Sequence, residues 1–250
     1  MFGLRKPRLL ITAQQQQWVD DSFRRLASLL GTQRFRLAKV ILPTSEFFPD
    51  AFDGSESALQ NMFRRVAGYM QVDPTSIDVS IFTTEDHLTR QLVPFYEVHS
   101  SGAAGLYHHD PEARAHISID EVLLKDPVGL VAVLTHELGH IILLRPGLVE
   151  RKDPQMEPLN DLLTIFLGFG IFTANSAFRF EQHSTDRSQG WSARRQGYLS
   201  EELLGYSLAR FAFEHGESKP RWFSHLSTNV KSYAKQSADW LAHRPEPFLF

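Results

Sequence analysis

Cysteine is missing from the 250-residue chain, so neither a disulfide framework nor a thiolate metal site can form. Any metal must therefore be held by His, Asp or Glu side chains. An excess of positive charge is missing as well, because the formal net charge is −3 at pH 7. This charge argues against a nucleic-acid partner, which usually leaves a basic footprint. Arg187, Arg194 and Arg195 lie close in sequence, and we interpret them as a solvated face.

Long hydrophobic runs are also lacking. The two most apolar stretches, 128–144 and 162–178, fall short of the roughly 20 residues that a membrane-spanning helix needs, and both contain polar residues. They predict helices buried in a globular core, without stable membrane insertion. The apolar run 9–11 is too short for the core of a signal peptide. We therefore expect a cytoplasmic protein.

The spacing of apolar residues predicts both helices and strands. Helical spacing covers 14–30 and 55–70, and short strands are expected at 39–43 and 78–83. Between the first strand and the second helix, Phe47, Phe48 and Phe52 are expected to pin a loop to the core. The N-terminal region, residues 1–100, is therefore expected to be α/β.

The second region, residues 101–250, begins with a predicted hairpin. Its arms are 102–108 and 115–119, with turn residues between them and His108-His109 near the tip. Asp126-Pro127 is a helix start, since Asp accepts free N–H groups and Pro fits the first turn. Further helices are expected at 158–180, 201–215 and 224–241. The fold class is α+β, with a small mixed sheet and a mainly helical C-terminal part, and the two regions form one compact unit.

The motif that carries chemistry is His136-Glu137-Leu138-Gly139-His140. Residues four apart lie on the same face of a helix, so two imidazoles there can bind one ion. Glu137 is offset by one position, which puts its carboxylate beside the ion, where it can accept a proton from water. Apolar flanks on both sides suit a helix buried in a core. The alternative is a helix with two satisfied core histidines.

A catalytic zinc site needs a third protein ligand. No further histidine follows at helical spacing, because positions 143 and 146 are Leu and Pro. The candidates are the acidic residues downstream: Glu150, Asp153, Glu157 and Asp161. Among them, Glu157 begins a helix that then becomes apolar, and Asp161 lies one turn later, where it could hydrogen-bond a ligand imidazole.

His136-Glu137-x-x-His140 followed by Glu157-x-x-x-Asp161 resembles the gluzincins, the metallopeptidase group that includes thermolysin. The resemblance implies a zincin-like core in 101–250 and one Zn²⁺ per chain, bound by His136, His140 and Glu157. It also implies that Asp161 supports a ligand histidine from the second shell. Segments 157–180 and 190–206 further resemble a group of bacterial zincin-like proteins, and that group brings no known substrate.

The resemblance implies a metallopeptidase in which Glu137 is the general base and a peptide or protein is the substrate. An extended peptide would pair with 115–119 as the edge strand. A donor to the oxyanion is also expected late in the chain, and the candidates are His183, Arg195, Tyr198 and Tyr206. Two alternatives remain: a zinc-binding regulatory module without turnover, and a membrane-associated metallopeptidase.

Overall fold

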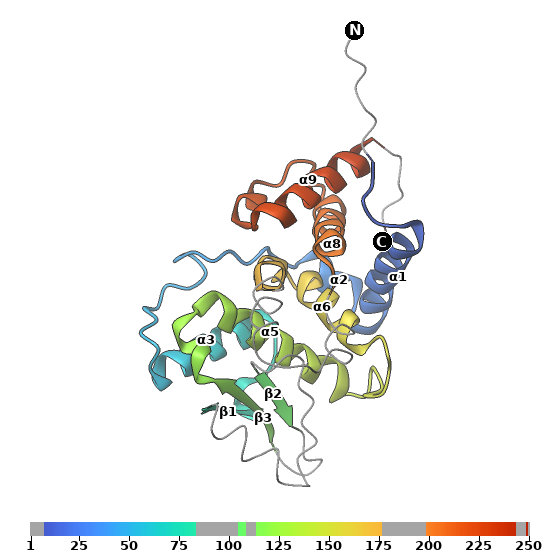
Figure 1. Cartoon of the computed structure of the whole chain (residues 1–250). Helices are drawn as coiled ribbons and strands as arrows, with labels where there is room; N and C mark the ends of the chain where they lie inside the picture. Colours follow the sequence, from blue (N-terminus) through green and yellow to red (C-terminus); the bar gives the residue numbers. More distant parts are fainter. Residues whose placement is uncertain (1–7, 84–104, 109–113, 177–198, 244–248, 250) are drawn as a thin grey trace, which may run out of the picture. The chain divides into compact units, whose positions relative to one another are not determined.

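The computed structural model describes residues 8–83, 105–108, 114–176, 199–243 and 249, with the backbone alone at 105–108. The protein is mixed helix and strand and mostly helical (Figure 1). It divides into two units. Among the described residues, unit 1 comprises 8–42, 157–176, 199–243 and 249, and unit 2 comprises 43–83, 105–108 and 114–156. The boundary expected at residue 100 lies outside the described residues.

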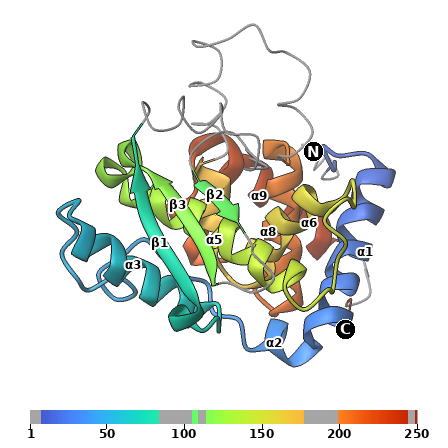
Figure 2. The same cartoon turned by 90° about the horizontal axis from the view of Figure 1, so that it is seen from below.

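Unit 2 contains a three-stranded mixed sheet in the order β1-β3-β2 (Figure 2). β3 (Ala115–Asp120) pairs in parallel with β1 (Ile77–Phe82) and antiparallel with β2 (Gly105–His108). The predicted hairpin is therefore confirmed. The prediction that 115–119 form an edge strand is wrong. β3 pairs with β1 on one side and with β2 on the other, so neither of its sides is free to pair with a peptide.

Two helices pack with this sheet. The helix α3 (Glu56–Tyr69) contacts β1, and α5 (Pro127–Leu144) contacts both α3 and β2. Successive side chains of a strand point to opposite faces of the sheet. Ile77, Val79 and Ile117 are accordingly buried, whereas Asp78 is exposed. The rings of Phe47 and Phe48 pack against Tyr69 on α3, which is exposed, so these two contacts hold the aromatic loop to a helix surface rather than to the core.

The start of α5 follows from its first residues. Asp126 accepts a hydrogen bond from the N–H of Gly129, and Pro127 takes the first helical position. The five-residue 3₁₀ helix η2 (Glu121–Lys125) leads into it. Among the described helices, α5 alone is long and apolar enough to span a membrane, and 72% of it is buried within the protein. This burial agrees with the helix predicted inside a core.

Among its described residues, unit 1 contains helices and no strand. Its helices are α1 (Ala13–Leu30), α2 (Thr32–Arg36), α6 (Met156–Phe166), a helical segment at 170–176, α8 (Glu201–Glu214), the 3₁₀ helix η3 (Arg221–His225) and α9 (Thr228–Ala242). Phe35 on α2 is at the centre of the core, with its ring against those of Phe23, Phe166 and Phe211. α8 and α9 pack closely, since a Cβ on Gly205 would meet the Cβ of Tyr233 at 2.5 Å.

Two predictions for this unit need correction. The helix expected at 158–180 is interrupted after Phe166, because Gly168 adopts a left-handed backbone with φ of +90°. The strand expected at 39–43 is absent from the described structure. The N–H of Ile41 instead donates to the carbonyl oxygen of Gly168 at 2.9 Å, so this extended segment satisfies its backbone against a helix break rather than a sheet.

A cluster of charged side chains is buried in unit 1. The guanidinium of Arg210 on α8 is 1% exposed and lies 3.3 Å from Asp20 of α1 and 3.4 Å from Glu214. Tyr206 donates its hydroxyl to Asp20, and the N–H of Leu249 donates to both carboxylate oxygens of Glu214. The cluster thus ties α1, α8 and a residue near the C-terminus together. No local sequence pattern indicates this cluster.

Burial raises the pKa of Glu214 above its ordinary value, and the Leu249 N–H and the charge of Arg210 oppose that rise. A raised folded-state pKa contributes stability that is complete below the unfolded-state pKa of about 4.3. That stability is lost as the pH rises through the folded-state pKa. We therefore expect wild type to lose stability relative to Glu214→Gln as the pH rises from about 4.3 through the folded-state pKa of Glu214. Urea unfolding of both proteins at a series of pH values over this interval checks this. The expectation is wrong if the free energy of unfolding of wild type, minus that of Glu214→Gln, stays constant or increases with pH.

Candidate metal centre

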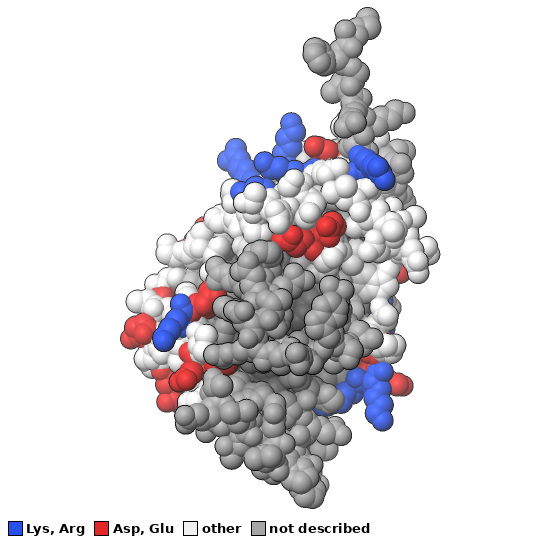
Figure 3. Space-filling model, in the orientation of Figure 1, with Lys and Arg blue, Asp and Glu red and all other residues white. Residues whose placement is uncertain are grey.

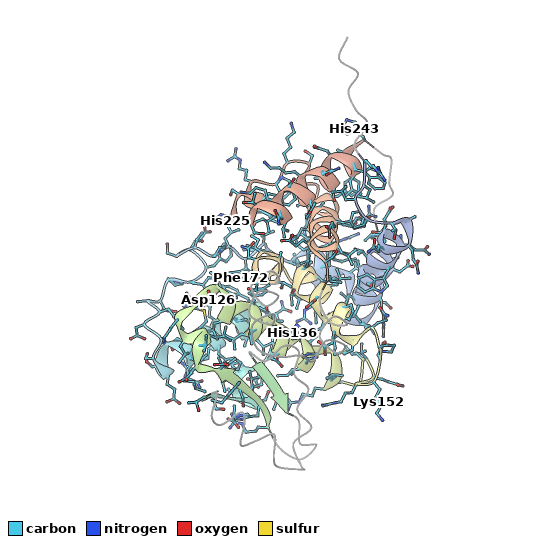
Figure 4. The ribbon with its side chains drawn as sticks, in the orientation of Figure 1. Asp126, His136, Lys152, Phe172, His225 and His243 are labelled. Atoms are coloured by element: carbon cyan, nitrogen blue, oxygen red, sulfur yellow. The ribbon has the colours of Figure 1, made fainter. Side chains whose placement is uncertain are left out.

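α5 brings His136 and His140 together in unit 2. Their Nε2 atoms lie 3.1 Å apart, and the two ring planes are nearly perpendicular, at 82°. His140 is 9% exposed, and His136, labelled in Figure 4, is half-buried. The four-residue spacing predicted this approach, and the apolar neighbours Leu138 and Ile141 keep this stretch of helix inside the core.

Glu157 completes a group that could hold a metal ion. Its carboxylate and the imidazoles of His136 and His140 place one ligand atom each within 4.8 Å of one another. Glu157 is the second residue of α6 and directly follows Met156, which belongs to unit 2. The described residues hold no other such group of three His, Cys, Asp or Glu side chains.

The other acidic candidates have different surroundings. The carboxylate of Asp153 accepts the N–H of Gln155 at 2.8 Å in the turn before α6. Glu150 is exposed in the loop that follows α5. Neither residue belongs to the group that could bind a metal. The choice among the sequence candidates therefore falls on Glu157, and Pro158 is tolerated because it lies in the first turn of α6.

The two histidines suit a tetrahedral metal. Bonds of about 2.0–2.1 Å from zinc to each imidazole nitrogen, at the tetrahedral angle, would place the two nitrogens roughly 3.3 Å apart. The observed separation of 3.1 Å is close to this value. Two imidazoles and one carboxylate also form a donor set that is known for catalytic zinc and leaves one position open. The residues present therefore fit a metal ion.

Glu137 is the next residue of α5 after His136 and is only 3% exposed. One residue along a helix turns the side chain by about 100°, so its carboxylate does not share the face that carries the two imidazoles. Carboxylates are rarely buried without a polar partner or a function. Its place beside the metal-binding face is what a proton acceptor for a nearby water would need.

Asp161 lies one turn after Glu157 on α6 and is 2% exposed. Its Oδ2 accepts the N–H of Leu199 at 3.4 Å, and its backbone carbonyl accepts the hydroxyl of Thr164 at 2.7 Å. The first bond engages its side chain within unit 1, and the second engages only its backbone. Support of a ligand histidine by Asp161 stays a prediction.

The expected oxyanion donors His183, Arg195 and Tyr198 lie outside the described residues, as does His109. Tyr206, the fourth candidate, is described and has another role. Its ring is completely buried in unit 1, and its hydroxyl donates to Asp20 at 3.1 Å. Tyr206 is therefore a core residue that supports the buried charge cluster.

One further polar pair went unnoticed in the sequence. Ser80 on β1 and His116 on β3 lie on neighbouring strands, and the distance from Oγ to Nε2 is 2.9 Å. The pair depends on the parallel register that places Asp78 opposite His116. Only a correct alignment of β1 with β3 could have revealed it, because nothing in either segment alone specifies that register.

Comparison with known proteins adds nothing to this geometry. No protein-family model, no curated protein and no solved structure matches the chain. The function is therefore inferred from the residues of the metal group.

Proposed function

We propose that the chain is a zinc-dependent hydrolase, specifically a metallopeptidase with a zincin-like core. The observation that carries the proposal is the group of His136, His140 and Glu157, with Glu137 next to the first of them on α5. A purely structural zinc site would close all four positions with protein ligands, whereas among the described residues this group supplies three. An open position together with a neighbouring carboxylate supports hydrolysis.

In this proposal His136, His140 and Glu157 hold one zinc ion. The bound ion would lower the pKa of a coordinated water to about 7 and polarise the substrate carbonyl. The chain itself supplies the proton transfers. Glu137 accepts a proton as the water attacks and then delivers it to the leaving nitrogen, so a single carboxylate serves as base and then as acid. The burial of α5 holds these side chains in place.

A peptide substrate is proposed from the gluzincin resemblance, because fold and site alone do not define a substrate. The edge-strand mode of binding through 115–119 is not retained, since β3 is the middle strand. We also propose that the protein acts in the cytoplasm. The burial of α5, the one described helix apolar enough to span a bilayer, favours this over a membrane-associated peptidase.

The direct test is the zinc content of the purified protein. We expect about one zinc per chain, because three ligands form a single site. His140→Ala should lose the metal, and Glu157→Gln should bind it more weakly by at least the roughly 10- to 100-fold that loss of a residue supporting a ligand costs, because a neutral amide is a poorer ligand than a carboxylate. Elemental analysis and competition with a chromogenic chelator measure both effects.

His116→Ala is the matched control, since His116 is also a half-buried histidine of unit 2 and lies outside the metal group. It should keep its zinc. Hydrolysis of a peptide library by wild type should stop after treatment with chelator and return with added zinc. A wild-type protein that stays metal-free after zinc is supplied would refute the proposal.

A further inference from the structure

Unit 1 has a surface pocket of about 600 Å³ that shares no residue with the metal group. It is formed by the segment that follows α8, by η3 and by Leu42, and Figure 4 labels one of its residues, His225. Pockets that bind small organic molecules usually measure about 300–1,000 Å³. The volume is therefore sufficient for an organic ligand rather than a single ion.

Backbone hydrogen bonds hold the walls of this pocket. α8 ends at Glu214, Gly216 just beyond it has a φ of +73°, and the N–H of Glu217 donates to the carbonyl of Ala212 at 2.8 Å. This arrangement is a Schellman motif, which turns the chain sharply from the helix into the pocket. On the other side, Asn175 donates to the carbonyl of His225 and accepts the N–H of Ser227, both at 2.8 Å. The pocket is therefore preformed.

The chemistry of the lining is mixed. Trp222 is 8% exposed, and its Nε1 donates to the carboxylate of Glu217 at 3.0 Å, which fixes the indole. Together with Leu42 it provides an apolar wall. Lys219 and Arg221 are exposed at the same pocket, and neither side chain makes a hydrogen bond or ion pair with any residue of the described part of the chain. Two cations against the one carboxylate of Glu217 leave an excess of positive charge.

We propose that this pocket binds a small organic phosphate, with the phosphate between Lys219 and Arg221 and an apolar part against Trp222 and Leu42. A phosphate monoester carries about −1.5 to −2 charges at pH 7, which two cations can neutralise. A guanidinium fork suits phosphate oxygens, and a lysine adds a point charge. Figure 3 also shows Lys and Arg side chains over the α9 part of unit 1, but no residue of α9 lines the pocket.

Titration calorimetry with phenyl phosphate tests this on the full chain. The protein is first treated with chelator, so that phosphate cannot bind a metal. We expect saturable one-to-one binding that weakens as salt is added. Inorganic phosphate should bind more weakly because it lacks the apolar part, and phenol should not bind because it lacks the charge. Benzoate separates the two kinds of anion. If it binds as tightly as phenyl phosphate, the assignment to phosphate is wrong.

Lys219→Ala and Arg221→Ala should each weaken binding by about 10-fold, the usual loss for a hydrogen bond to a charged group. Lys235→Ala is the matched control, an exposed cation on α9 that does not line the pocket, and it should bind like wild type. All three positions are exposed, so folding should be unaffected. Absence of saturable binding in the millimolar range, or equal weakening by the control, would overturn the proposal. Neither result bears on the zinc site.

Discussion

Glu137→Gln is expected to abolish peptide hydrolysis while the protein keeps its zinc. The amide has nearly the shape of the carboxylate but cannot accept the proton of the attacking water. Loss of a general base lowers the rate by about 10²- to 10⁴-fold, and we expect the upper part of this range because Glu137 serves both as base and as acid. Because Glu137 is not one of the three metal ligands, the zinc content should not change. The two measurements are kcat on a peptide substrate and bound zinc per chain.

The matched control is Glu150→Gln, which makes the same chemical change at an exposed carboxylate in the loop after α5. It should retain wild-type activity. The comparison also separates the two functions considered for a zincin-like core, since a binding module has no need of a base beside the metal. If Glu137→Gln hydrolyses peptides at the wild-type rate, Glu137 is not the base and the proposed mechanism fails.

The metal group was predictable from the sequence because every step that builds it is local. His136 and His140 are one helical turn apart, and the capping residues Asp126 and Pro127 fix where that helix starts. Glu157 lies only 17 positions beyond His140 in the sequence, at the start of the next helix. Short-range periodicity and capping chemistry therefore indicated the two histidines and their helix, and the resemblance to the gluzincins selected Glu157 among the acidic residues downstream.

Features that depend on distant pairing were not predictable in the same way. Whether Ala115–Asp120 is an edge or a central strand depends on β1, which is supplied by a segment on the far side of residues 84–104. The buried charge cluster is more remote still, since Tyr206 and Asp20 are 186 residues apart. Each of these residues alone has the pattern of an ordinary helix position, and only the tertiary contact shows its partner.

The break between α6 and the helical segment at 170–176 is the point where a single added methyl group should have the largest effect on stability. Gly168 has a φ of +90°, and a Cβ at this position would overlap the carbonyl oxygen of Lys39. Gly168→Ala therefore adds backbone strain of about 1–2 kcal/mol and forces apart two backbone segments that cannot yield as a side chain could. We expect a total loss of at least about 4 kcal/mol in the free energy of unfolding, measured by urea denaturation followed by circular dichroism.

Gly31 provides the matched control for this substitution, because it has the same φ of +90° and nothing lies within 4 Å of the position of its Cβ. Gly31→Ala should therefore lose only the backbone contribution, about 1–2 kcal/mol. The difference between the two variants isolates the close approach of residues 39–41 to the helix break, which the hydrogen bond from Ile41 to Gly168 also reports. Equal destabilisation by the two variants would mean that this close approach does not exist in solution.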